Sequence, residues 1–387
     1  MAIPFIDLKA QYRRIEEQIR SNMEAVLEHG AYIMGPEIKS LEKTLGTYIG
    51  SQFAVGCSSG SDALLMALMA LDIGPGDAVF TSPFTFFATA EEIAFLGATP
   101  VFVDIDPRTY TMDPARLEQA IGALKAKDTS LYPLPKGYET LTPRAVIPVD
   151  LFGQAADYDR IESLCNEHGL KIIEDGAQAF GATYKDRVKK TCGFGEIGCT
   201  SFFPAKPLGC YGDGGMCFTD DAKLYEKLVS IRVHGMGSDR YDNIRIGING
   251  RMDSLQAAIL QAKFILFPEE IGLRTTVAAR YTALLAEHVV TPYVPEGYTS
   301  VWAQYSVLAR DSNHREALQA HLREAGIPTA IYYPIPLHLQ TAFTGLGYTK
   351  GTMPVSERVG ERVFSLPMHP YLEKDVQEKI AACIKEI

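Results

Sequence analysis

Apolar positions recur with two different spacings along the first 260 residues of the chain. Across residues 12–26 they follow helical spacing, which predicts a helix capped by Asp7 and ended by Gly30, and Pro36 opens a second helix. Between helices lie short runs of apolar, often β-branched residues, which are typical of parallel strands covered on both faces. The alternation predicts a doubly wound α/β domain with a mostly parallel sheet. The strand-like runs are residues 53–57, 78–81, 100–105, 145–151 and 170–173.

The pattern changes near residue 260. A long helical stretch runs from near Asp253 to about Glu287, and we expect a break at Pro268 because proline lacks the N–H that continues a helix. We therefore predict a large α/β domain at residues 1–260 and a smaller C-terminal α+β domain at residues 261–387. Its expected elements are a half-exposed strand at 301–308, a helix at about 314–325, an extended segment at 328–333 and a last helix from about Glu373.

In one stretch of the large domain, the apolar residues follow neither helical nor strand spacing. Residues 124–141 are rich in Lys, Pro, Tyr and Thr and separate a helix from the next strand-like run. We interpret them as an inserted excursion on the surface.

The composition narrows the class of function. With 37 Lys and Arg against 47 Asp and Glu, the formal net charge is -10, and no basic run occurs, which argues against nucleic acid and membrane surfaces as partners. The longest apolar run, residues 63–71, is far shorter than the roughly 20 residues of a membrane span, and we find no signal peptide. Seven cysteines without a Cys-x-x-Cys pair, and eight histidines without ligand spacing, argue against disulfides and a metal site. We expect a cytoplasmic protein with reduced thiols.

One lysine stands in surroundings that favour a nucleophile. Lys206 lies among aromatic, proline and glycine residues in the segment 201–215, SFFPAKPLGCYGDGG. Loss of hydration lowers the pKa of an amine, so that the neutral, reactive form becomes available. The glycines let the backbone approach a ligand closely. Taken alone, Lys206 could equally belong to a surface loop between two strands.

Two further segments and one aromatic residue could complete a ligand site. The strand-like run from Leu170 ends at Asp175, and ligands of open α/β sheets gather at the carboxyl ends of strands. Asp175 could hold a pyridine nitrogen in its protonated form, or simply cap a helix. The small residues 58–62, SSGSD, open a helix whose N-terminus favours a phosphate, although capping alone would also explain them. Phe86 could stack on a flat cofactor ring or pack in the core.

In their order and spacing, these segments resemble the DegT-type sugar-nucleotide aminotransferases, which are pyridoxal-phosphate (PLP) enzymes of the aspartate aminotransferase fold (fold type I). The resemblance implies PLP as the cofactor, with pyridoxamine phosphate as its aminated form. By this match Lys206 is the catalytic lysine that forms the Schiff base, Asp175 the partner of the ring nitrogen, and Gln178 the neighbour of the ring hydroxyl. The matching motifs span nearly the whole chain, from FIDL at 5–8 and GPE at 35–37, through 201–215, to YPIPL at 333–337 and SLPMHP at 365–370.

The same resemblance assigns the rest of the cofactor site. It places Phe86 against the cofactor ring and Gly60, Ser61 and Ser201 in the cup that binds the phosphate. Ser61 stands where the family frequently has threonine, and it keeps the hydroxyl. Asn249 matches a residue that reaches the phosphate from the partner subunit, so the resemblance implies a homodimer with shared active sites.

The match is strongest to aminotransferases that act on a UDP-linked 3-keto-N-acetylglucosaminuronate for surface polysaccharide synthesis, such as O-antigen or lipopolysaccharide. It implies glutamate as the amino donor. Arg251 could pair with the uronate carboxylate, or form an interface salt bridge instead. Tyr332 and Tyr333 could hydrogen-bond sugar oxygens, although Tyr332 stands where histidine is common. Arg240 and Arg245 could serve the diphosphate.

Three other functions stay open at this point. The acceptor could be a keto sugar on another nucleotide, for example a dTDP-linked one. A pyridoxamine-dependent sugar dehydratase would share the fold, but such relatives replace the lysine that is present here as Lys206. A non-catalytic regulator could sense a sugar nucleotide or PLP, although it would have no need of a lysine that shuttles protons.

Overall fold

The computed structural model describes residues 3–239 and 241–387. Its centre is a seven-stranded sheet in the order β1-β7-β6-β5-β4-β2-β3. Strand β7 runs antiparallel to both of its neighbours, β1 and β6, and the other pairs are parallel. The predicted α/β fold with a mostly parallel sheet is therefore confirmed. The strands are β1 (Phe53–Cys57), β2 (Asp77–Thr81), β3 (Thr99–Phe102), β4 (Thr142–Ile147), β5 (Lys171–Asp175), β6 (Ile197–Ser201) and β7 (Gly215–Thr219).

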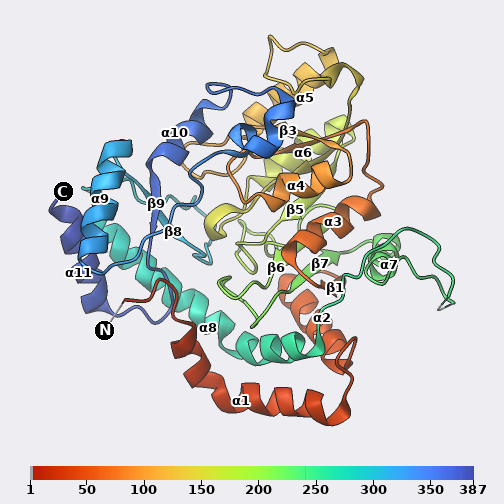
Figure 1. The fold of residues 1–387 in the computed structure, drawn as a ribbon, viewed down its shortest axis with the longest axis horizontal. Coiled ribbons are helices and arrows are strands. Elements are labelled where there is room, and N and C mark those ends of the chain that lie inside the picture. The colour runs from red at the N-terminus through yellow and green to blue at the C-terminus, as the bar shows by residue number, and fades with distance from the viewer. Residues whose placement is uncertain (1–2, 240) are drawn as a thin grey trace.

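Helices cover both faces of this sheet, as Figure 1 shows. Alternate strand residues enter different cores: Phe80 and Val146 pack with one set of helices, and Val79 and Ile147 with the other. The first face carries α5 (Pro114–Ala126) and α6 (Tyr158–His168), with α2 (Pro36–Ile49) over the β1 and β7 end; the second carries α3 (Gly60–Ala70), α4 (Ala88–Phe95) and α7 (Ala222–Ile231).

Helices α1 (Leu8–His29) and α8 (Ser254–Leu285) lie together along one side of the molecule (Figure 1). The predicted ends of α1 are confirmed, because Asp7 accepts a hydrogen bond from Ala10 N at 2.9 Å and Gly30 takes a left-handed φ of 68°. The predicted break at Pro268 is wrong, since α8 continues through it. Its packing against α1, α2 and α11 (Lys374–Lys385) offsets the hydrogen bond that proline cannot form.

A two-stranded antiparallel sheet forms the centre of the C-terminal part. The predicted strand at 301–308 is shorter in the structure, where only β8 (Tyr305–Leu308) pairs with β9 (Val363–Leu366). The second half of α8 packs into this core, so the predicted domain boundary near residue 260 falls within a helix that both parts share. The other elements are α9 (Ser312–Glu324), α10 (Pro354–Arg362) and the short 3-10 helices η3 (Leu337–Leu339) and η4 (Thr341–Leu346).

The predicted excursion is shorter and less superficial than expected. Helix α5 continues past Leu124 to Ala126, and the remaining residues to 141 contain the short 3-10 helix η1 (Tyr138–Thr140). Tyr132 in this segment is buried, and its hydroxyl accepts a hydrogen bond from Asp104 N at 2.9 Å. An aromatic anchor therefore fixes the segment to the core.

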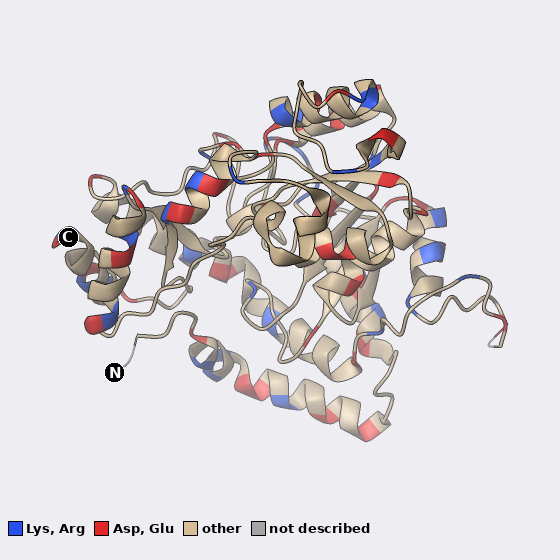
Figure 2. Ribbon diagram, turned by 45° about the horizontal axis from the view of Figure 1, so that its top comes forward, with Lys and Arg blue, Asp and Glu red and all other residues tan. Residues whose placement is uncertain are grey.

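Charged residues of both signs alternate along the surface helices, as Figure 2 shows, without a continuous basic face in that view. None of the helices within residues 3–239 and 241–387 combines the length and the apolar character that crossing a membrane requires.

Candidate active site

The predicted site residues come from strands whose carboxyl ends lie at one edge of the large sheet. Asp175 ends β5 and Ser201 ends β6, and these two strands are parallel. Because β7 is antiparallel to both β6 and β1, β1 points the same way, and it leads into Gly60 at the start of α3. The topology thus brings three distant segments of sequence together, where α/β folds place their ligands.

The start of α3 forms a cradle against Ser201. Ser59 caps the helix by accepting a hydrogen bond from Asp62 N at 3.0 Å. A Cβ added at Gly60 would lie only 2.6 Å from Ser201 Cβ, so glycine is required for this approach. The N–H groups of Gly60 and Ser61 belong to the first turn, where a helix supplies no acceptor for them. With the Ser201 hydroxyl they form a donor set that fits a phosphate.

Asp175 is a buried carboxylate with two hydrogen-bond donors. Thr89 Oγ1 donates to it at 2.7 Å and Ala177 N at 3.2 Å. Burial raises the pKa of Asp175, while these donors and the charge of Lys206 act in the opposite direction. The sequence reasoning missed Thr89. Its only signal was the spacing to Thr85, four residues earlier, which lies 3.1 Å from it, hydroxyl to hydroxyl.

Lys206 is half-buried in the loop that follows β6. Its backbone N–H donates to Phe203 O at 2.9 Å, and its amine has no hydrogen-bond or ion-pair partner among the described residues. Burial lowers the pKa of Lys206, and the carboxylate of Asp175 partly opposes this effect. The amine therefore lies in the field of the Asp175 carboxylate, and no described group holds it in a hydrogen bond or ion pair.

Gln178 and Tyr333 form one wall of the site. Gln178 Oε1 accepts a hydrogen bond from Phe152 N at 2.8 Å, and its Nε2 donates to the Tyr333 hydroxyl at 3.1 Å. The Tyr333 ring lies 6.4 Å from the ring of Phe86, centroid to centroid. Phe86 is 58% exposed, which leaves its face accessible to a ligand ring. Tyr333 thus lies beside the residues predicted for the cofactor ring, and its neighbour Tyr332 is half-buried.

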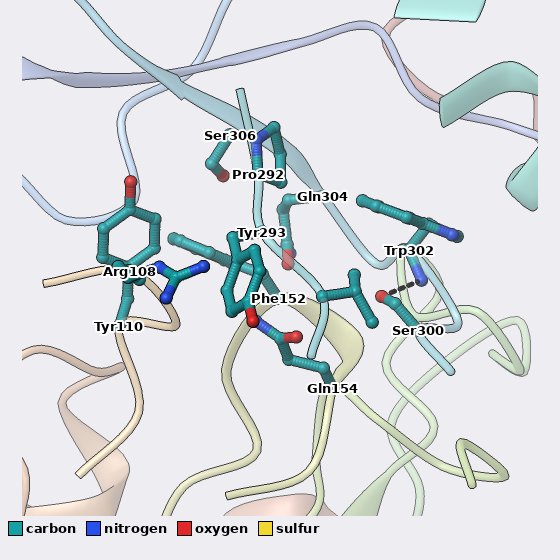
Figure 3. A pocket seen from close by; sticks show the side chains of 11 residues that line it. Arg108, Tyr110, Phe152, Gln154, Pro292, Tyr293, Ser300, Trp302, Gln304 and Ser306 are labelled. Carbon is teal, nitrogen blue, oxygen red and sulfur yellow. Dashed lines mark hydrogen bonds between the residues drawn. The ribbon is translucent and has the colours of Figure 1, made fainter. Parts of the chain in front are cut away.

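A small cavity behind Phe152 marks where the C-terminal part meets this wall (Figure 3). In its lining, the guanidinium of Arg108 stacks on the Tyr293 ring, 3.6 Å from the ring centre. Gly153 has a φ of 111°, and a Cβ there would lie 2.8 Å from Trp302 N. This close contact fixes the backbone that holds Gln178.

The segment between α7 and α8 projects from the molecule, as Figure 1 shows at the right. We call residues 232–253 the arm. Asn249 on the arm is exposed, and its side chain forms no hydrogen bond within the described part of the chain. Ser58 N donates to Gly250 O at 3.1 Å, which places Arg251 beside the start of α3. Arg240 lies outside the described residues.

Arg251 has no salt bridge within the described chain. Its Nε atom is buried and lacks a hydrogen-bond partner, although the residue as a whole is half-exposed. Arg245, also on the arm, is half-exposed. No hydrogen bond or salt bridge within the described chain occupies either guanidinium group.

Comparison with known proteins identifies the family of this chain. A model of the DegT/DnrJ/EryC1/StrS aminotransferase family matches residues 13–385. The chain is 47% identical over 374 residues to the UDP-2-acetamido-2-deoxy-3-oxo-D-glucuronate aminotransferase of Pseudomonas aeruginosa, covering 96% of both chains. It is 42% identical to a pleiotropic regulatory protein of Geobacillus stearothermophilus, covering 100% of this chain and 98% of the relative. It is 41% identical to a UDP-N-acetyl-3-dehydro-alpha-D-glucosamine 3-aminotransferase of Acidithiobacillus ferrooxidans, covering 99% and 97%.

Solved structures agree with this assignment. An aminotransferase from Brucella abortus described by the same family names superposes with a TM-score of 0.93 at 47% identity, over 99% of both chains. The structure of NtdA from Bacillus subtilis, with bound cofactor PMP, superposes with a TM-score of 0.86 at 27% identity. That match covers 100% of this chain and 85% of NtdA.

Proposed function

Because the chain belongs to the DegT/DnrJ/EryC1/StrS aminotransferase family, we propose that it transfers an amino group from glutamate to a UDP-linked 3-keto-N-acetylglucosaminuronate, with PLP as its cofactor. The predicted family and enzyme class are confirmed by the family match and the relatives. PLP is supported by the structural neighbour that carries the aminated cofactor, PMP. The product would enter surface polysaccharide synthesis.

One observation carries the assignment of the cofactor site. A lysine amine without a partner among the described residues and a buried carboxylate influence each other, and a cradle that fits a phosphate lies at the same edge of the sheet. This set of donors and charges fits PLP. Gly60, Ser61 and Ser201 would hold its phosphate, Phe86 would face its ring, and Gln178 would lie beside the ring hydroxyl. When bound, PLP withdraws electrons from the substrate carbon next to the nitrogen.

The chain's own residues would direct this chemistry. Lys206 would first hold the cofactor covalently and then, once released, carry a proton between two carbons on the same face of the site. Asp175 would stay ionised and keep the ring nitrogen protonated. The bond from Thr89 supports this role, because a donated hydrogen bond favours the charged carboxylate over the neutral acid.

The uronate is proposed on the chemistry of Arg251. The guanidinium has no salt bridge within the described chain and lies beside α3, which suits a carboxylate that arrives next to a diphosphate. One relative is named for a 3-oxo-glucuronate and another for the corresponding neutral glucosamine, so both acceptors are candidates. Tyr332 and Tyr333 would contact the sugar.

The test compares the keto uronate with its neutral counterpart as amine acceptors. R251A should cost the uronate about tenfold or more in kcat/KM beyond its cost to the neutral sugar, because only the uronate loses a charge-assisted pair, worth about 1.5–3 kcal/mol. R245A is the matched control and should affect both acceptors equally through the shared diphosphate. Equal losses in R251A, or a wild-type preference for the neutral sugar, would refute the uronate.

The amino donor is tested by colour. Holoenzyme with PLP should be yellow, and glutamate should bleach it towards the spectrum of the pyridoxamine form. A panel of keto sugar nucleotides, including dTDP-linked ones, then identifies the acceptor as the compound that restores the yellow form. Failure of glutamate to bleach the enzyme, while another amino acid does so, would replace the proposed donor.

We propose a cytoplasmic homodimer. Large apolar side chains on the arm are exposed in the single chain, namely Tyr241 at 87%, Ile244 at 57% and Ile246 at 85%, and a partner subunit would cover them. Asn249 on the same arm would then reach the partner's phosphate site. Reduced, free cysteines suit the cytoplasm. An active monomer in sedimentation at assay concentration would contradict the shared site.

A regulatory role is the second candidate, because one relative is named a pleiotropic regulatory protein. A sensor would bind PLP or a sugar nucleotide without turning over. Glutamate-dependent bleaching followed by recovery with a keto sugar would exclude a purely sensing function. The amine of Lys206 has no partner among the described residues, which favours the enzyme, since binding alone needs no mobile proton carrier.

A further inference from the structure

A second lysine is buried next to the loop of Lys206. Lys263 on α8 is only 1% exposed, and its amine donates a hydrogen bond to the carbonyl of Gly209, three residues after Lys206. Among the described residues, no carboxylate lies within ion-pair distance of this amine. Glu270, the acidic residue of α8 whose charge acts on Lys263, accepts hydrogen bonds from Gln11 and Tyr371 instead.

Such a lysine is costly for the fold. A buried ammonium without a counter-ion loses its hydration, and a similar apolar side chain would avoid that loss. Burial lowers the pKa of Lys263 to about 8, with Arg274 acting in the same direction and Glu270 and Cys210 in the opposite one. Its one hydrogen bond to the described chain ends on the loop of Lys206, so the position of that loop is the evident use of this side chain.

The loop itself is tightly folded around Gly209. A Cβ at Gly209 would lie 2.5 Å from Phe203 O and 2.7 Å from Pro204 O, so the chain crosses itself closely at this point. Cys210 N donates to Phe202 O at 2.8 Å and closes the base of the loop. Lys206 lies between these crossing points, and a shift of Gly209 would be passed on to it.

Helix α8 holds the loop at two places. Gln256 Oε1 accepts a hydrogen bond from Tyr211 N at 2.9 Å, and Lys263 follows Gln256 by seven residues. Seven residues make about two helical turns, so both side chains project from the same face of α8. The helix therefore fixes the second half of the loop, at Gly209 and Tyr211, from one rigid surface.

We propose that Lys263 is a positioning residue, which holds Gly209 and thereby sets the place of the Lys206 amine relative to the cofactor. The proposal rests on the proposed function, because it assumes that Lys206 is the residue that carries PLP. Lys263 itself touches neither substrate nor cofactor in this assignment. Its effect is on the geometry of the reaction, for which a misplacement of about 1 Å can cost about a hundredfold in rate.

The test compares K263M with wild type and with K227M as holoenzymes. Methionine fills the space of Lys263 without donating a hydrogen bond. Lys227 is the control, because its amine also donates to a carbonyl, that of Ala70 at 2.9 Å, away from the Lys206 loop; it pairs with Asp72 as well and is partly exposed. Three properties are measured: hydrogen exchange of the backbone at residues 203–211, the pH at which the visible band of the cofactor titrates, and kcat with KM for glutamate.

In K263M, exchange at residues 203–211 should rise roughly tenfold or more, as expected for loss of a charged hydrogen bond. The titration of the visible band should move, and kcat should fall about 10- to 100-fold while KM stays within about twofold. K227M should match wild type in all three. Wild-type exchange, titration and kcat in K263M would overturn the proposal, since a lysine that only fills space would leave them unchanged.

Two further measurements keep the outcome decisive. If K263M does not fold, K263Q replaces it; its shorter donor should give intermediate values, and wild-type values would again overturn the proposal. Borohydride reduction and peptide mapping of wild type separates this inference from the proposed function. If Lys206 carries no reducible cofactor, the proposed function fails, while hydrogen exchange still decides whether Lys263 holds the loop.

Discussion

The hydrogen bond from Thr89 to Asp175 makes a sharp prediction about charge in the site. T89V removes the hydroxyl with little change in shape, and both residues are buried, at 1% and 5% exposure. Losing a hydrogen bond to an ionised group costs about 1.5–3 kcal/mol, against about 1 kcal/mol for a neutral pair. Thr85 provides the control. Thr89 has one hydrogen, which it gives to Asp175, so Thr85 must donate to Thr89, and T85V removes only a neutral bond.

The dependence on pH follows from the raised pKa of Asp175. Burial raises the pKa of Asp175 in the folded protein above its unfolded value of about 3.9. The cofactor-free protein therefore loses stability as the pH rises from the unfolded pKa to the folded pKa, because ionising the buried carboxyl costs more than ionising the exposed one. T89V should raise the pKa of Asp175 further. The difference in unfolding free energy between wild type and T89V should therefore be largest at pH 8, where the carboxyl is ionised, and smaller at acidic pH, where it is protonated.

Urea unfolding of cofactor-free wild type, T89V and T85V at pH 8 and pH 5 measures these losses. In the holoenzyme, T89V should also lower kcat more than T85V, because Asp175 holds the ring nitrogen less firmly. The reasoning is refuted if T89V costs no more than T85V at pH 8, or if its cost grows as the pH falls.

The remaining predictions concern the cofactor site. K206A should abolish turnover and the borohydride-reducible link to protein; labelling of a different lysine in wild type would disprove the assignment. D175N should lose most activity while still binding PLP through its phosphate, and near-normal turnover would count against the role of Asp175. G60A should weaken PLP binding about tenfold or more, because its Cβ would collide with Ser201, at 2.6 Å from that residue's Cβ; titration of cofactor-free protein with PLP measures this, and unchanged affinity would remove Gly60 from the cradle.

Much of the fold was predictable because local sequence signals agree with it. The cap at Asp7, the stop at Gly30 and the apolar runs of the parallel strands rest on short-range physics, and the structure has them. The break at Pro268 was predicted wrongly because the local penalty of a proline is outweighed by the packing of α8 on other helices, which residue spacing does not reveal. Residues 301–304 were predicted as strand, but β9 pairs no further than Tyr305. Their backbone bonds instead to the turn at 152–153, with Val301 N donating to Gly153 O at 2.9 Å and Ala303 N to Phe152 O at 3.2 Å.

The candidate site divides in the same way. Lys206, Asp175 and Gly60 stand in segments of distinctive residue types: a lysine among glycines and aromatics, a carboxylate at the end of an apolar strand, and small residues at the start of a helix. These types made them candidates, and their order along the chain, through the resemblance to the family, assigned their roles. Thr89 and Lys263 could not be named from sequence, since a threonine or a lysine within a helix has no distinctive pattern. Their importance comes from burial and from the one acceptor to which each donates, Asp175 Oδ2 and Gly209 O. The local sequence determines which helices and strands form, because caps, stops and apolar spacing act over a few residues. Contacts between residues about 50 to 90 positions apart, such as those of Thr89 and Lys263, depend on how the sheet and α8 pack, and only the tertiary structure decides these contacts.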